Sequence, residues 1–116
     1  MAQIVIYQKP TCTTCRSVYR ILRESGADFE SVDYYLDRIP RHKLKELLRK
    51  MGIRAKDLLR SKEEIYRKLE LGKKDLSEED LIDLMVRYPD LIQRPIVEKG
   101  AKAILARPAE RVKEIL

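Results

Sequence analysis

The sequence is poor in the nitrogen and sulfur side chains that bind metal ions. It has two cysteines, Cys12 and Cys15, and one histidine, His42. A structural zinc site takes four such ligands, and the chain has no second cysteine pair that could complete one. We therefore expect no metal site. The two cysteines are then either a redox pair or small residues of a core.

The sequence also lacks long apolar segments. No run approaches the roughly 18–20 apolar residues that span a membrane, and the N-terminus lacks the basic and apolar stretches of a signal peptide. We therefore expect a cytosolic protein that does not enter membranes. In that reducing compartment, two cysteines are more often catalytic or redox-sensing than a structural disulfide.

No purely basic run is present, although the net charge is +6. The basic residues are mixed with acidic ones along helical segments, as in Lys43-Leu44-Lys45-Glu46. This mixing argues against direct nucleic-acid binding. It favours a small oxyanion as the partner of the excess positive charge.

The chain has 116 residues, of which 44% are hydrophobic, which is the size of one folded domain. An apolar run over residues 3–7, a helical pattern that ends near Ser25-Gly26 and a β-like run over residues 29–35 predict a βαβ unit with parallel strands. Residues 40–88 indicate an inserted all-helical block. Its first helix is expected between Pro40 and Gly52, and a short helix follows at residues 55–59. Another helix closes near Gly72, and the capping signature at Ser77 begins the last one.

After this block the strand pattern returns at residues 95–98 and 103–105, with a hairpin turn between them. Pro108 opens a last helix, in which we expect Val112, Ile115 and Leu116 to point inward. The order βαβ, helical block, ββα predicts an α/β chain with a thioredoxin/glutaredoxin-like fold and a small mixed sheet. We expect one such domain over residues 1–116.

Cys12 lies in the loop between the first predicted strand and the first predicted helix. A thiol at a helix N-terminus meets unpaired backbone N–H groups and the positive end of the helix dipole, which lower its pKa below the usual value of about 8.5. Arg16 adds positive charge one turn further on. A C-x-x-C pair between a strand and a helix is typical of a thioredoxin-like redox motif, so we expect Cys12 to be a nucleophile.

Three arginines stand at the ends of predicted elements rather than on polar helix faces. Arg60 lies at a helix end, Arg94 precedes Pro95 at a strand start, and Arg107 precedes the last helix. A planar guanidinium donates paired hydrogen bonds to two oxygens of an anion and stays charged at neutral pH. These arginines are candidates for an oxyanion site, although each taken alone is also compatible with a solvated side chain.

Several separated motifs together resemble those of the glutaredoxin-dependent arsenate reductase (ArsC) family. In chain order they are Tyr7-Gln8-Lys9-Pro10-Thr11-Cys12-Thr13-Thr14-Cys15-Arg16, Leu58-Leu59-Arg60, Leu81-Ile82-Asp83-Leu84-Met85, Leu91-Ile92-Gln93-Arg94-Pro95-Ile96-Val97 and Ala106-Arg107-Pro108. The resemblance covers nearly the whole chain with its spacing intact. It is therefore much more specific than C-x-x-C alone.

The resemblance implies a thioredoxin-like fold, a cis peptide bond before Pro95 and the reduction of arsenate to arsenite. In the family, the cysteine that matches Cys12 attacks arsenic to form a covalent adduct. The arginines that match Arg60, Arg94 and Arg107 hold the oxyanion. The resemblance implies no bound cofactor, because glutathione and glutaredoxin supply the electrons.

Two positions depart from the family pattern. Gln8 stands where these enzymes often have a histidine that helps to ionise the nucleophile, and Cys15 stands where they commonly have a serine. A second thiol one turn from Cys12 can attack a Cys12 adduct or mixed disulfide and release the product by forming an internal disulfide. A dithiol reductant such as thioredoxin is then an alternative to glutathione.

Cys15 also leaves two other functions open. Spx-type transcriptional regulators are similar in fold, carry a C-x-x-C redox switch, usually share the Arg-Pro pair at Arg94 and bind RNA polymerase instead of arsenate. Arg60 and Arg107 favour the enzyme, because a regulator does not need a complete oxyanion cradle. The other alternative is a general thiol–disulfide oxidoreductase, which equilibrates with glutathione but ignores arsenate.

Overall fold

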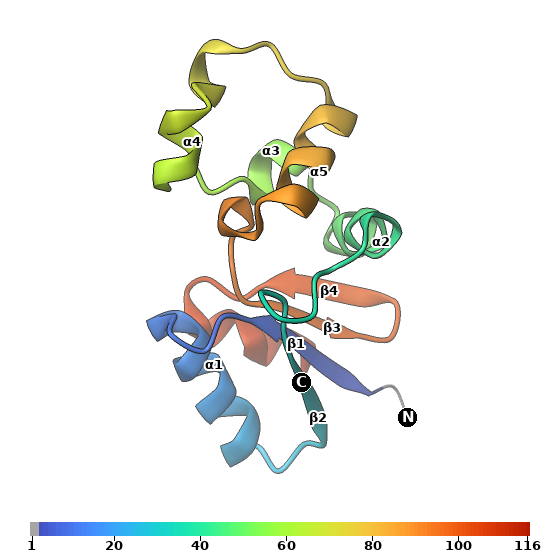
Figure 1. The fold of residues 1–116 in the computed structure, drawn as a ribbon. Coiled ribbons are helices and arrows are strands. Elements are labelled where there is room, and N and C mark those ends of the chain that lie inside the picture. The colour runs from blue at the N-terminus through green and yellow to red at the C-terminus, as the bar shows by residue number, and fades with distance from the viewer. Residues whose placement is uncertain (1–2) are drawn as a thin grey trace. The chain divides into compact units, whose positions relative to one another are not determined.

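The structure, a computed structural model, describes residues 3–116 of the chain. They form two compact units, one of residues 3–37 together with 94–116 and one of residues 38–93. The first is an α/β unit and the second is helical (Figure 1). Between residues 3 and 116 no helix has the length and apolar character needed to cross a membrane.

A mixed four-stranded sheet with the order β2-β1-β3-β4 is the centre of the α/β unit. The strand β1 (Ile4–Gln8) runs parallel to β2 (Phe29–Asp33) and antiparallel to β3 (Ile96–Lys99). β4 (Lys102–Leu105) forms an antiparallel hairpin with β3. The predicted βαβ unit and the hairpin after the helical block are confirmed.

β2 ends at Asp33, whereas the sequence pattern predicts a strand that continues to Tyr35. The chain turns there because the carbonyl of Asp33 accepts hydrogen bonds from the backbone N–H groups of Leu36 and Asp37, at 3.1 and 2.9 Å. The Asp33 carboxylate also accepts one from the N–H of Tyr35, at 3.0 Å. This aspartate turn overrides the strand preference of the tyrosines and places Tyr34 and Tyr35 beyond the end of the strand.

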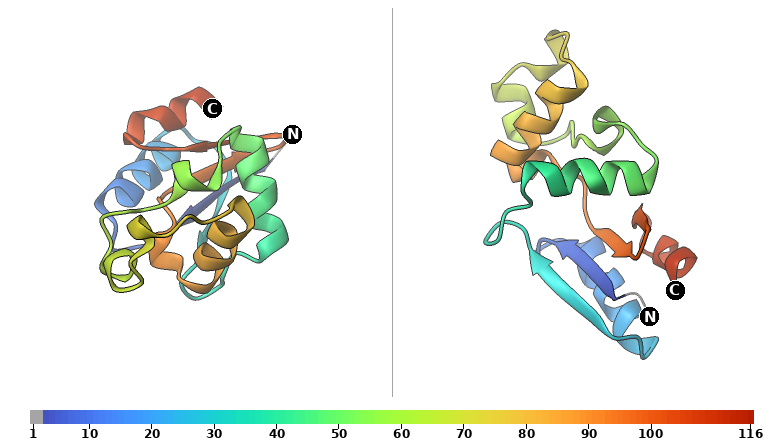
Figure 2. Two further views of the ribbon diagram at one scale, coloured as in Figure 1. Left: turned by 90° about the horizontal axis from the view of Figure 1, so that it is seen from above. Right: turned by 90° about the vertical axis from the view of Figure 1, so that its right-hand side faces the viewer.

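The helix α1 (Thr13–Glu24) and the C-terminal 3-10 helix η3 (Ala109–Ile115) pack against each other and cover one face of the sheet (Figure 2). Their shared core includes Ile4, Ile6, Val18, Leu22, Val97, Val112 and Ile115. Gly26, with φ of 75°, follows the end of α1, as predicted.

The last helix differs from its prediction in one residue. Val112 and Ile115 are buried, but Leu116 is 44% exposed. A 3-10 helix has about three residues per turn, so residues 112 and 115 lie on one side and residue 116 is rotated away from it.

Residues 38–93 form the predicted helical block. It contains α2 (Arg41–Met51), α3 (Ala55–Leu58), α4 (Glu64–Lys68), α5 (Glu78–Arg87) and the 3-10 turns η1 (Leu71–Lys73) and η2 (Pro89–Leu91). α2 lies between Pro40 and Gly52, as predicted, although Pro40 is its N-cap and not part of its first turn; Gly52, with φ of 68°, is its C-cap. The predicted cap of α5 is also present, since Ser77 and Asp80 exchange side-chain-to-backbone hydrogen bonds at 3.1 and 3.2 Å. The organisation as one domain over residues 1–116 stays a prediction.

Candidate active site

Cys12 is the N-cap residue of α1. Its backbone is extended, with φ of −79° and ψ of 126°, and its N–H donates to the carbonyl of Lys9 at 2.9 Å. The Cys12 Sγ accepts a hydrogen bond from the backbone N–H of Cys15 at 3.3 Å. The sulfur thus occupies the position that a serine or aspartate oxygen takes in an ordinary N-cap. The predicted placement of Cys12 at a helix N-terminus is confirmed.

The pKa values of the two thiols shift in opposite directions. Partial burial favours the neutral form of Cys12, but the hydrogen bonds from Cys15 and the positive charge of Arg94 outweigh it and lower the Cys12 pKa. Cys15 is fully buried, and that burial, followed by its hydrogen bond to Cys12, raises its pKa to about 12. Cys12 is therefore the more acidic thiol, and Cys15 is a protonated donor beside it.

Arg94 is the cation that favours the Cys12 thiolate, and it is only 5% exposed. Its Nη1 donates to the hydroxyl of Tyr35 at 3.5 Å, and its guanidinium carbon lies 6.0 Å from the centre of the Tyr35 ring. Burial raises the pKa of the neighbouring Tyr34 above its usual range, so the Tyr34 hydroxyl stays protonated. Hydroxyl groups therefore hold Arg94 without removing its charge.

Arg107 lies in the same unit as Arg94. The Nη1 of Arg107 donates to the backbone carbonyl of Arg94 at 2.9 Å. The structure thus brings Cys12, Cys15, Arg94 and Arg107 together in the α/β unit. The Arg94-Pro95 peptide bond is cis, as the family resemblance implies, and so is the Arg107-Pro108 bond, which the sequence motifs did not predict.

Lys9, Tyr34 and Tyr35 also lie at the candidate site, and the sequence patterns did not point to them. The Nζ of Lys9 lies 4.7 Å from the centre of the Tyr35 ring. Parallel strands bring their carboxyl ends to the same edge of a sheet, and β1 and β2 are followed by Lys9 and by the two tyrosines. This rule points to residues that follow the two strands. Because tyrosines are good strand formers, the sequence pattern instead assigns Tyr34 and Tyr35 to the strand itself.

Arg60 belongs to the helical unit. Its backbone N–H donates to the carbonyl of Leu91 at 2.7 Å, and its Nε donates to Glu63 Oε1 at 2.5 Å. Its assignment to the oxyanion site stays a prediction.

The other candidate residues are more scattered. Arg16 is exposed on α1 and its supporting role stays a prediction, whereas Gln8 is buried and donates to the hydroxyl of Ser31. His42 is exposed on α2. In the described part of the chain, no three His, Cys, Asp or Glu side chains gather in a way that could hold a metal ion.

A thioredoxin-like α/β unit with a C-x-x-C pair at a strand-to-helix junction defines a thiol redox protein. Residues 7–115 match the model of the ArsC family, and the chain belongs to this family.

Two curated relatives cover almost the whole chain. The arsenate reductase of Yersinia enterocolitica is 42% identical over 100% of this chain and 82% of its own length. The uncharacterised protein YfgD of Escherichia coli K12 is 40% identical over 98% of this chain and 97% of its own length. The solved structure of an arsenate reductase from Vibrio cholerae is similar with a TM-score of 0.91 and 36% identity, covering 99% of this chain and 98% of that one.

Proposed function

We propose that this protein is an arsenate reductase-like thiol oxidoreductase that reduces arsenate to arsenite, with Cys12 as its nucleophile. The observation that carries the proposal is the environment of the Cys12 sulfur, where the N-terminus of α1, Cys15 and Arg94 favour the thiolate. Arsenate chemistry needs such a thiolate to attack arsenic and cations to bind the oxygens. Membership of the ArsC family and the similar arsenate reductases support the same activity.

In the first step, the Cys12 thiolate attacks arsenic and forms an S–As bond. A hydroxyl group of the arsenate takes up a proton and leaves as water. In the proposal, Arg94 and Arg107 bind the remaining oxygens, and the family resemblance assigns Arg60 to the same anion. Tyr35 is a positioning residue, because it contacts Arg94.

In the second step, a thiol attacks the sulfur of Cys12. The electron pair of the S–As bond stays on arsenic, which falls from As(V) to As(III) and leaves as arsenite. We infer that Cys15 is this thiol, so that both cysteines become a disulfide while arsenic gains two electrons. Burial keeps the pKa of Cys15 high, but the part of the shift caused by Cys12 disappears when Cys12 is bonded to arsenic.

An external thiol then restores the two cysteines. Glutathione with glutaredoxin, or thioredoxin, is the proposed source of electrons, and the cytosolic location belongs to the same proposal. Turnover with each reductant distinguishes them, because an internal disulfide is a substrate for a dithiol protein.

The test is arsenite release under anaerobic conditions from arsenate and the reduced protein, with glutathione plus glutaredoxin in one arm and thioredoxin in another. Cys12→Ser serves as the inactive variant, and Arg49→Ala, an exposed arginine of α2, serves as the matched control. We expect arsenite that depends on Cys12 in at least one arm. No arsenite in either arm would overturn the proposal. A redox-sensing regulator would then be the alternative, and binding to RNA polymerase would test it.

A further inference from the structure

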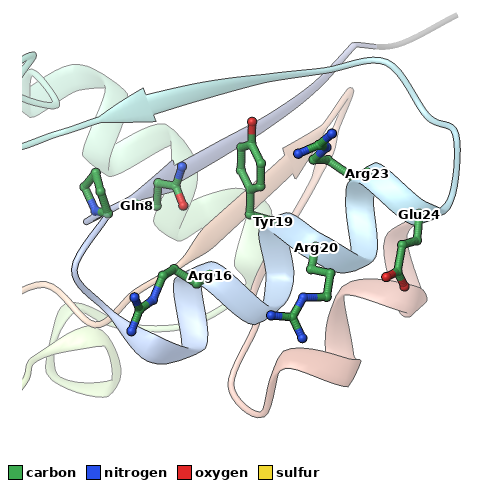
Figure 3. A pocket seen from close by; sticks show the side chains of 7 residues that line it. Gln8, Arg16, Tyr19, Arg20, Arg23 and Glu24 are labelled. Carbon is green, nitrogen blue, oxygen red and sulfur yellow. The ribbon is translucent and has the colours of Figure 1, made fainter.

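The proposed mechanism does not use a groove on the outer face of α1 (Figure 3). The groove has a volume of about 700 Å³ and is lined by Gln8, Pro10, Arg16, Tyr19, Arg20, Arg23 and Glu24. Ligand pockets of small molecules have volumes in this range. The hollow therefore suits a small molecule.

The groove begins beside the redox loop and runs along α1. Pro10 precedes Cys12 by two residues, and the backbone N–H of Arg16 donates to the carbonyl of Cys12 at 3.0 Å. From Arg16, the groove follows a single helix face through Arg20 to Arg23, at the i, i+4 and i+7 positions. At a rise of about 1.5 Å per residue, the seven steps from Arg16 to Arg23 span roughly 10 Å, the length of an extended tripeptide.

The groove is rich in positive charge. Arg16, Arg20 and Arg23 are all exposed, and within residues 3–116 none of them forms an ion pair. Figure 3 shows their guanidinium groups spread along the helix, with Glu24 at its far end. Separate guanidinium groups of this kind favour a ligand with more than one carboxylate, and the glutamate can accept an amine.

Resting on the proposed function, we propose that this groove binds the reductant as a small peptide thiol with two carboxylates and one amine. The arginines bind the carboxylates, Glu24 binds the amine, and Tyr19 offers a ring and a hydroxyl. At its Arg16 end the groove adjoins the loop that carries Cys12, because Pro10 and Arg16 both line it. Glutathione has this chemistry and is the probe.

The binding test uses S-methylglutathione, which keeps the charges but cannot react with Cys12. Its affinity is measured by calorimetry for the wild-type chain, for the double variant Arg20→Glu/Arg23→Glu and for the control Arg49→Glu. We expect the double variant to lose at least about tenfold in affinity, the control to keep it, and added salt to weaken wild-type binding. Circular dichroism checks that the variants are folded. We expect them to fold, because Arg20, Arg23 and Arg49 are all exposed.

The activity test compares glutathione with dithiothreitol, an uncharged thiol, as the reductant. We expect the ratio of the two rates to fall about tenfold in Arg20→Glu/Arg23→Glu and to stay constant in Arg49→Glu. No wild-type binding, or equal affinity in the charge-reversed variant, would overturn the proposal. A loss of rate in the double variant that is confined to reduction by glutaredoxin or thioredoxin would also overturn it, because the groove would then be a protein-docking surface. Because S-methylglutathione binding needs no arsenate turnover, its failure is distinguishable from failure of the proposed function.

Discussion

Two pairs of basic side chains, one pair in each unit, are held by different kinds of partner. In the helical unit, Arg41 is held by Glu79 and Asp83, and Lys45 is held by Glu79. In the α/β unit, the hydroxyl of Tyr35 contacts Arg94, and a backbone carbonyl holds Arg107. A carboxylate neutralises the cation that it holds, whereas a hydroxyl or a carbonyl orients the cation and leaves its net charge for a ligand. The partner that holds an arginine or lysine therefore indicates whether its charge is available to bind an anion.

The nucleophile gives the largest expected effect. Cys12→Ser places an alcohol, which does not ionise near neutral pH, at the N-cap of α1. We expect arsenite formation to fall to background, while the fold is kept because serine is a good N-cap residue. The checks are arsenite release and the melting temperature. Activity retained in Cys12→Ser would show that the reacting thiol is not Cys12.

The comparison of the arginines predicts the next effect. Arg94→Ala removes a charge held by a hydroxyl and Arg41→Ala removes one held by carboxylates, so only Arg94→Ala is expected to weaken arsenate binding. A hydrogen bond to a charged group is worth about 1.5–3 kcal/mol, which predicts a rise in the KM for arsenate of roughly tenfold to a hundredfold. Steady-state kinetics of the two variants measures it. Equal effects of both substitutions would show that the partner of an arginine does not decide whether it binds arsenate.

The two thiols give a smaller effect, on pKa. Cys15→Ala removes the side-chain hydrogen bond to Cys12 but leaves the backbone N–H, so the pKa of Cys12 is expected to rise. Cys15→Ser keeps a hydroxyl donor and is expected to raise it less. A higher pKa lowers the thiolate fraction at pH 7, so alkylation of Cys12 by iodoacetamide slows, and its midpoint moves to higher pH. An unchanged midpoint in Cys15→Ala would contradict the role of Cys15 as a donor.

The smallest expected effect concerns Arg60, a proposed substrate-binding arginine that a carboxylate holds. Glu63→Gln removes the negative charge next to Arg60 and keeps the size of the side chain. Partly exposed pairs contribute about 0.2–1 kcal/mol, so we expect the KM for arsenate to fall by up to about fivefold. Initial-rate kinetics against Glu64→Gln, an exposed neighbour, checks this. An unchanged KM would remove Arg60 from the proposed oxyanion site.

The order of the elements was predictable because local signals agree with the final fold. Gly26 and Gly52 take positive φ where the helical patterns stop, and the Ser77 cap begins α5. Each of these signals needs only neighbouring residues. The N-cap position of Cys12 belongs to the same class, which is why the nucleophile could be proposed from the sequence.

The surroundings of the nucleophile were not predictable in the same way. The sequence suggests Arg16 as the nearest cation, because it lies one turn along the helix. The cation that lowers the Cys12 pKa is Arg94, more than 80 residues away, which β3 carries to the side of β1. Tyr35 reaches Arg94 only because β2 stops at Asp33. These contacts depend on sheet register and on a turn that competes with strand propensity, and both are tertiary properties.

The most direct test of the proposed mechanism is a single turnover of the fully reduced protein with arsenate, under anaerobic conditions and with no other thiol present. Arsenite is quantified together with the free thiols of the chain. The proposed mechanism predicts an amount of arsenite equal to the amount of protein and the loss of both thiols to a Cys12–Cys15 disulfide. Arsenate that stays unreduced while both thiols still titrate would contradict it.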